Sequence, residues 1–143
     1  MPFDLASFAL GVATALIAAL VIHWLTLLRD RESRAHIEKM MRESRKSDFI
    51  DYATKWKTRV ERTNEMEEIA KEFAIVFNEF SGRVARIKIL LDEKSCVQLD
   101  TLSENVSFAG AYVTEQDEKS RALIGRKKLT DAIEAVISFV KKI

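Results

Sequence analysis

Three side chains in the sequence could act as a base, a nucleophile or a soft metal ligand: His23, His36 and Cys96. Nucleophilic catalysis by serine or cysteine needs a base within hydrogen-bond reach. His23 lies inside a long uncharged stretch, so His36 is the one histidine left to serve a polar site. A single cysteine excludes an intramolecular disulfide and a cysteine-rich zinc site, and it fits a reducing compartment. The sequence therefore predicts no catalytic residue.

The acidic residues are not arranged as metal ligands either. Glu67 and Glu68 are adjacent in the sequence, as are Asp92 and Glu93, and adjacent side chains diverge on a helix. No His/Cys pair has the spacing of a zinc site, and no glycine-rich phosphate loop is present. We therefore expect no metal, no cofactor and no enzymatic activity.

One short motif matches the pattern of a known family. The segment RESRAH, from Arg31 to His36, has the spacing R-x4-H. This spacing resembles the signature of HEPN ribonucleases, a group of helical and often membrane-linked defence proteins. The resemblance implies a ribonuclease site at Arg31 and His36. The resemblance is limited to this segment. In that family the motif lies in a cleft between two helical subunits, whereas here it follows directly on an apolar stretch. The chain is therefore not assigned to that family.

Composition and charge limit the fold class. The chain has 143 residues, 48% of them hydrophobic, which suits one modest core and an appendage. One proline and four glycines leave long helices uninterrupted, so we predict an all-α protein. The formal net charge of +1 argues against a strongly basic face, and no nucleic-acid partner is expected.

A stretch without charged residues runs from Leu5 to Leu28. At about 1.5 Å per residue such a helix is roughly 36 Å long, enough to cross a hydrocarbon core of about 30 Å. All 23 Lys and Arg residues follow it, so the positive-inside rule places the N-terminus outside and the rest in the cytoplasm. We predict a single-pass protein of the inner or plasma membrane. A cleaved signal peptide is the alternative, but the chain starts MPFD, without a basic n-region.

Small residues recur at every fourth position of this stretch: Ser7, Gly11, Ala15 and Ala19. In a lipid bilayer, close packing through small residues is a main source of helix association. This ridge therefore predicts a homo-oligomer. The alternative is that the alanines are ordinary residues of a membrane span.

The cytoplasmic membrane interface is expected around five residues: His23, Trp24, Arg29, Arg31 and Arg34. An aromatic side chain such as Trp24 anchors at the level of the headgroups, and arginines favour anionic lipid. His23 continues the ridge of small residues. It is either a neutral imidazole that reaches the headgroups or an ionisable functional group.

The sequence predicts three segments: a transmembrane anchor (residues 1–28), a basic juxtamembrane helix or stalk (residues 29–47) and a helical bundle (residues 48–143). Between Arg29 and Lys46, few apolar side chains are larger than alanine. That segment lies beside anionic headgroups or forms a solvated helix.

Apolar residues after Ser47 recur at spacings of three and four, which is typical of helices with one buried face. The longest such stripe runs from Met66 to Leu91. Its apolar face is widened by Ile69, Ile75, Val76 and Ile89. We predict a bundle of three or four antiparallel helices. The expected core contains Trp56, Met66, Phe73, Phe77, Phe80, Val84, Leu91, Leu99, Ile133 and Val136.

Helix starts are expected at residues that commonly cap helices, and Gly125 leaves room for a break in the last helix. The candidate caps are Ser47 or Asp48, Asn64 with Glu67, Ser95, and Asp131 with Glu134.

These features favour a binding function. The first interpretation is a membrane-anchored interaction or scaffold protein that acts at the cytoplasmic face, self-associates and binds a cytoplasmic protein partner. The second is an oligomeric pore-forming or membrane-perturbing effector of a defence or phage type. The third is the HEPN-like ribonuclease. A pore built from single spans needs a polar stripe, and Ser7, Thr14, His23 and Thr26 do not share one face.

Overall fold

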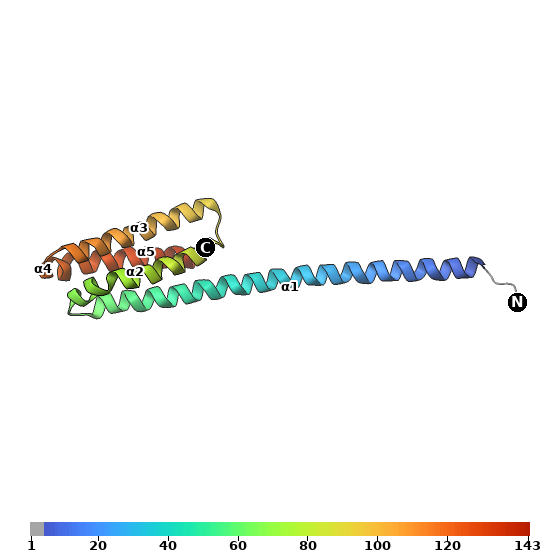
Figure 1. The fold of residues 1–143 in the computed structure, drawn as a ribbon, viewed down its shortest axis with the longest axis horizontal. Helices are drawn as coiled ribbons and strands as arrows, with labels where there is room; N and C mark the ends of the chain where they lie inside the picture. Colours follow the sequence, from blue (N-terminus) through green and yellow to red (C-terminus); the bar gives the residue numbers. More distant parts are fainter. Residues whose placement is uncertain (1–4) are drawn as a thin grey trace. The chain divides into compact units, whose positions relative to one another are not determined.

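The computed structural model describes the backbone from Leu5 to Ile143 and the side chains from Val12 onward. All regular elements in this range are helical, which confirms the prediction of an all-α protein (Figure 1). They are α1 (Leu5–Arg62), α2 (Met66–Lys88), α3 (Glu93–Glu115), α4 (Glu118–Ser120), the π-helical segment η1 (Arg121–Gly125) and α5 (Arg126–Lys142). The chain forms two units, Met1–Met41 and Arg42–Ile143. The expected boundaries at residues 28 and 47 stay predictions.

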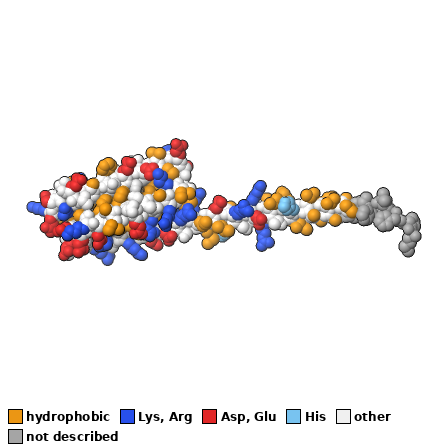
Figure 2. Space-filling view, in the orientation of Figure 1, with side chains coloured by type: hydrophobic (Ala, Val, Ile, Leu, Met, Phe, Trp, Pro, Cys, Tyr) orange, Lys and Arg blue, Asp and Glu red, His pale blue; other side chains and the backbone are white. Residues whose placement is uncertain are grey.

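The N-terminal unit consists of the first part of α1. By length and composition, α1 is the one helix among the described residues that could cross a membrane. Its side chains from Val12 to Met41 are all exposed. In Figure 2 hydrophobic side chains line the visible surface of the part of α1 that adjoins the grey residues, and charged side chains follow them along the chain.

Ser47 and Asp48 do not begin a helix, because both lie inside α1. The expected start of a new helix at this point is wrong. No proline or glycine occurs between Arg29 and Arg62, so nothing in the sequence stops the helix. Serine and aspartate are tolerated inside a helix where packing holds it, and Phe49 is buried directly after them.

The C-terminal unit encloses a hydrophobic core whose fully buried aromatic residues come from α1 and α2. From α1, Phe49 and Trp56 pack on Phe80 of α2, each with a ring-centroid distance of 5.4 Å. Trp56 also contacts Phe73, at 6.0 Å between centroids. From α3 and α5 the core receives aliphatic side chains, among them Leu99, Val106, Val113, Leu129, Ile133 and Val136.

The residues expected in the core fall into two groups. Trp56, Met66, Phe73, Phe80, Val84, Leu99, Ile133 and Val136 are buried. Phe77 and Leu91 are half-buried and pack against the core from its margin. Of the residues expected to widen the apolar face of α2, Ile69 is buried and Val76 is half-buried. Ile75 and Ile89 do not extend the buried face as expected, since they are 76% and 77% exposed. They lie on the opposite side of α2, which the rest of the unit leaves uncovered.

Polar contacts tie α1 to other helices of the C-terminal unit, among them the ion pair of Arg59 with Glu72 of α2 at 2.7 Å. The Tyr52 hydroxyl donates a hydrogen bond to the carbonyl of Val76 at 3.0 Å. The Lys57 ammonium lies 2.9 Å from a carboxylate oxygen of Glu134. The Tyr52 contact links α1 to α2 and the Lys57 contact links α1 to α5.

The expected caps of α2 and α3 are wrong by a few residues. The N-cap of α2 is Glu65, without a side-chain hydrogen bond, so Asn64 and Glu67 form no capping box. The N-cap of α3 is Asp92, whose carboxylate accepts a hydrogen bond from the backbone N–H of Ser95 at 2.7 Å. An acid at this place satisfies a free N–H and complements the helix dipole.

The last helix widens at Gly125 instead of breaking. In η1 the backbone N–H of Arg126 donates to the carbonyl of Arg121, five residues earlier. Gly125 is buried, and a Cβ there would lie 3.0 Å from Cγ2 of Val113. Because the helix continues, the expected capping box of Asp131 and Glu134 is also wrong: both residues lie inside α5.

Candidate functional site

The ridge of small residues is only partly described. Ala15 and Ala19 are exposed on α1, so they are available for contact. The side chain of Ser7 and the surroundings of Gly11 lie outside what the structure describes. Packing through this ridge stays a prediction.

The residues expected at the membrane interface also lie on α1. His23, Trp24, Arg29, Arg31 and Arg34 are all exposed. His36 is exposed as well, so both residues of the R-x4-H match lie on an open helix surface of the N-terminal unit. Neither of them lines the groove between α2 and α3 that is described next.

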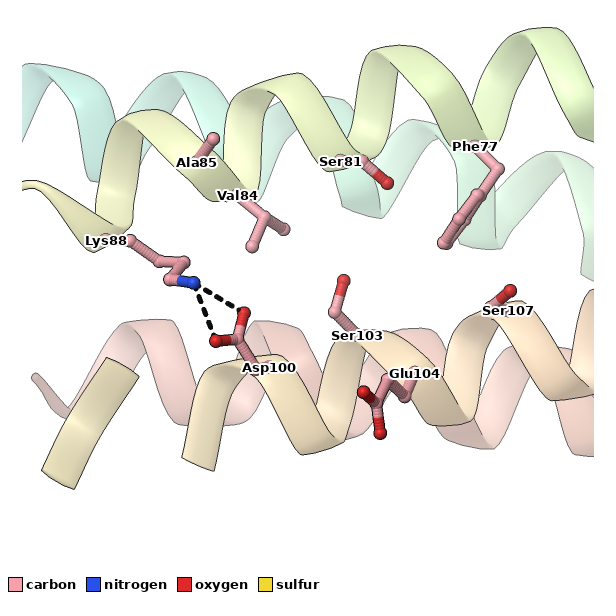
Figure 3. A pocket seen from close by; sticks show the side chains of 9 residues that line it. All are labelled: Phe77, Ser81, Val84, Ala85, Lys88, Asp100, Ser103, Glu104 and Ser107. Carbon is pink, nitrogen blue, oxygen red and sulfur yellow. Dashed lines mark hydrogen bonds and ion pairs between the residues drawn. The ribbon is translucent and has the colours of Figure 1, made fainter. Parts of the chain in front are cut away.

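A groove of about 460 Å³ lies between α2 and α3 in the C-terminal unit. Figure 3 shows Phe77 and Ser81 directed from α2 toward α3, and Ser103 directed from α3 toward α2. The groove is lined by Phe77, Ser81, Val84, Ala85, Lys88, Asp100, Ser103, Glu104 and Ser107. It exists because small side chains face each other here, so the two helices do not fill the space between them.

An ion pair closes one end of the groove. The Lys88 ammonium donates to both carboxylate oxygens of Asp100, at 2.8 Å and 2.6 Å (Figure 3). The hydrogen bond to Asp100 raises the pKa of Lys88, so this amine stays charged. A charged, paired amine is a poor nucleophile. Lys88 therefore links α2 to α3 instead of presenting a reactive group.

Phe77 forms an apolar wall of the same groove. Its ring stacks on Phe73 at 5.4 Å and on Phe80 at 6.1 Å between centroids. One face of the half-buried ring thus packs on the core, and the remainder borders the groove. The position of Phe77 at the margin of the core explains why the periodicity of α2 alone did not distinguish it from Phe80.

The groove offers hydrogen-bonding groups without a catalytic pair. Ser81, Ser103 and Ser107 supply hydroxyls, and no histidine or cysteine is among the residues that line the groove. The sequence analysis did not select these residues. The signal available was weak: Ser103 and Ser107 are spaced by four on α3, and Ser81 and Lys88 by seven on α2.

Two further observations concern metal and thiol chemistry. Among the described residues, no three His, Cys, Asp or Glu side chains gather into a possible metal site. The Cys96 thiol donates to the carbonyl of Lys88 at 3.4 Å, and the side chain is half-buried. This thiol therefore links the first turn of α3 to the last residue of α2.

Comparison with known proteins gives no relative from which a function could be carried over. No family model, no curated protein and no solved structure matches this chain.

Proposed function

We propose that the chain is a single-pass, membrane-anchored interaction protein that self-associates and presents a bundle of antiparallel helices at the cytoplasmic face. The N-terminus lies outside in this arrangement, and the C-terminal unit binds a cytoplasmic protein partner. Its role is that of a scaffold, with binding rather than catalysis as its activity.

The observation that carries this proposal is the composition of α1. One continuous helix begins with an uncharged stretch long enough for a bilayer and ends with Phe49, Trp56 and Val60 buried in a hydrophobic core. The proposed membrane anchor and part of the folded unit thus belong to the same element. That combination suits a protein whose purpose is to hold a binding surface at a membrane.

The polar features of the C-terminal unit support binding as the activity. The serine-lined groove between α2 and α3 contains an ion pair that satisfies the amine of Lys88 and the carboxylate of Asp100. Exposed apolar side chains on the surface of the unit, such as Ile75, Ile89 and Phe108, are the groups that protein contacts commonly bury.

The proposal is tested with the full chain carrying a C-terminal tag and expressed in cells. We expect the protein to remain in the membrane pellet after alkaline carbonate extraction. A membrane-impermeant reagent should label the tag only after the cells are opened. Two differently tagged copies should be recovered together after mild solubilisation.

The same cells distinguish the proposed scaffold from a pore. A scaffold leaves the membrane potential and dye retention unchanged on expression, whereas a pore collapses them. Release of the protein by carbonate, labelling of the tag on intact cells, or loss of membrane potential would each contradict the proposed function. A His36→Ala variant, compared with the parent for RNA degradation in the same cells, tests the ribonuclease interpretation.

A further inference from the structure

The uncovered face of α2 carries two large apolar side chains. Ile75 and Ile89 are 76% and 77% exposed, and Gly82 lies midway between them, seven positions from each. Seven residues make close to two helical turns, so the three residues share one face. Ile89 keeps the α conformation as the C-cap of α2, so the face extends to it.

Gly82 is not required by the fold of the chain itself. It is exposed, and a Cβ at this position would meet no atom within 4 Å. Glycine inside a helix is unfavourable relative to alanine because it loses more backbone freedom on folding. An open glycine at the centre of a helix face lets a second helix approach closely.

One acidic and one basic side chain lie along the same edge of this face, one on each side of Gly82 in the sequence. Glu79 precedes Gly82 by three residues, and Arg86 follows it by four. Glu79 lies 2.8 Å from Arg83 along its own helix, and its side chain remains 55% exposed. Among the described residues, Arg86 forms no ion pair. The face thus carries one acidic and one basic group at nearly equal distances from its centre.

We propose that this face of α2 binds the same face of a second copy, antiparallel, with a two-fold axis at Gly82. Such an axis places residues at equal distances before and after Gly82 opposite each other. Ile75 then packs on Ile89 of the second copy, and Glu79 meets Arg86 of the second copy. The face is self-complementary in shape and charge, as a symmetric dimer contact requires.

This inference rests on the proposed self-association and names a surface for it in the C-terminal unit. It is independent of the ridge on α1, which concerns contacts within the bilayer. The two surfaces are separable by experiment because variants on α2 leave the residues of the ridge unchanged.

Cysteine crosslinking of the full chain in membranes tests the arrangement. Copies with Ile75→Cys and copies with Ile89→Cys, both in a Cys96→Ser background and with different tags, are co-expressed and oxidised. In the proposed dimer these two positions face each other across copies. Two cysteines at the same position lie about 21 Å apart along the axis, because each is seven residues from the centre at about 1.5 Å per residue. A disulfide needs Cα atoms roughly 4–7 Å apart.

We expect a disulfide-linked dimer that contains both tags, and only background crosslinking when either variant is expressed alone. Val97→Cys, exposed on α3, replaces Ile89→Cys as the control and should give background crosslinking. Equal crosslinking of Ile75→Cys with itself would indicate a parallel contact and overturn the proposal. Background crosslinking for the mixed pair would overturn it as well.

Exchange of the charges supplies a second test that does not introduce cysteine. Glu79→Arg or Arg86→Glu alone gives a dimer with two like-charged pairs. In a full chain whose α1 ridge is disrupted by Ala15→Ile, co-purification of two tagged copies should therefore fall. Mixing one copy of each variant gives two opposite-charge pairs and should restore it. Failure of mixing to restore association would contradict the antiparallel register.

The outcomes separate this inference from the proposed function. Recovery of two tagged copies together, without specific crosslinking between positions 75 and 89, would reject the α2 contact and leave span-mediated association standing. If carbonate releases the protein but positions 75 and 89 still crosslink specifically, the membrane anchor is rejected and the α2 contact is supported.

Discussion

The ring of Phe73 lies directly against the backbone of Gly110, so that a methyl group at Gly110 would overlap the ring. This contact brings α2 and α3 close together beside the end of the serine-lined groove at which Phe77 and Ser107 lie. Phe73 in turn packs on Trp56 of α1. A glycine in α3 thus determines where the aromatic part of the core can form.

Replacement of Gly110 by alanine should therefore destabilise the protein, against the general rule for glycine inside a helix. We expect a loss of about 1–3 kcal/mol, as for an overpacked core, because the ring and the helix must move. Gly82→Ala is the matched control under conditions in which the protein is monomeric, since within one chain its Cβ would meet no atom within 4 Å, and it should then stabilise the fold by about 0.5–1 kcal/mol. Urea unfolding followed by circular dichroism measures both. Equal effects of the two substitutions would contradict the close contact.

Phe80→Ala should destabilise the protein far more than Phe77→Ala. Phe80 is fully buried between Phe49 and Trp56, so its removal leaves a cavity and should cost about 3–5 kcal/mol. Phe77 is half-buried beside the groove, where water can enter the space that it leaves. Thermal unfolding of the two variants in parallel checks the difference, and a larger effect of Phe77→Ala would show that the ring packing is misplaced.

The stability of the C-terminal unit should depend on pH through Glu134. The hydrogen bond from Lys57 lowers the pKa of Glu134 below its ordinary value of 4.5. A carboxyl group whose pKa is lower in the folded than in the unfolded state contributes its full stabilisation above the unfolded-state pKa, where it is charged in both states. This contribution is lost as the pH falls through the folded-state pKa.

The Glu134→Gln variant should therefore be less stable than the parent at neutral pH, and the two should converge in acid. The difference at neutral pH is at most about 1 kcal/mol, because the Glu134 side chain is 46% exposed and solvent screens the pair. Glu104→Gln, at an exposed position, is the control. A difference that stays constant from neutral pH to acid would exclude the ion pair as its cause.

Association within the membrane should depend on the size of the side chain at position 15. Ala15→Ile enlarges the ridge and should separate the spans, whereas Leu16→Ile, off the ridge, preserves volume and should leave association unchanged. A membrane two-hybrid assay of the isolated span fused to a reporter compares the variants. Equal signals for parent, Ala15→Ile and Leu16→Ile would mean that the alanines are ordinary residues of the span.

The positions of the buried residues could be predicted from periodicity wherever one helix face is consistently apolar. The steps of three and four from Met66 to Val84 fix which face of α2 turns inward, since only that face repeats with the helical period. The same steps could not show which residues lie at the edge of the core. Phe77 and Leu91 lie at such an edge, and their burial depends on how closely α3 approaches.

The ends of the helices were harder to predict, because several residues near each end could act as caps. Asp92 and Ser95 are both good capping residues, and the turn after Lys88 decides in favour of Asp92. Inside α1, Ser47 and Asp48 have the residue types of a cap but no break in the chain beside them. The groove between α2 and α3 depends on which small residues face each other across two helices. A single-sequence pattern does not contain that pairing.

The π-helical segment η1 has a consequence for how the sequence tolerates deletions. A π turn takes up one residue more than an α turn, so the chain between α4 and α5 holds a surplus residue. Loss of Leu123, which is 67% exposed, would convert the turn to α geometry and leave Leu129 and Ile133 on their inward side. Loss of one residue within α5 would instead rotate every later side chain by about 100° and turn the buried stripe outward. The segment thus marks a place where chain length could change over evolutionary time without repacking the core.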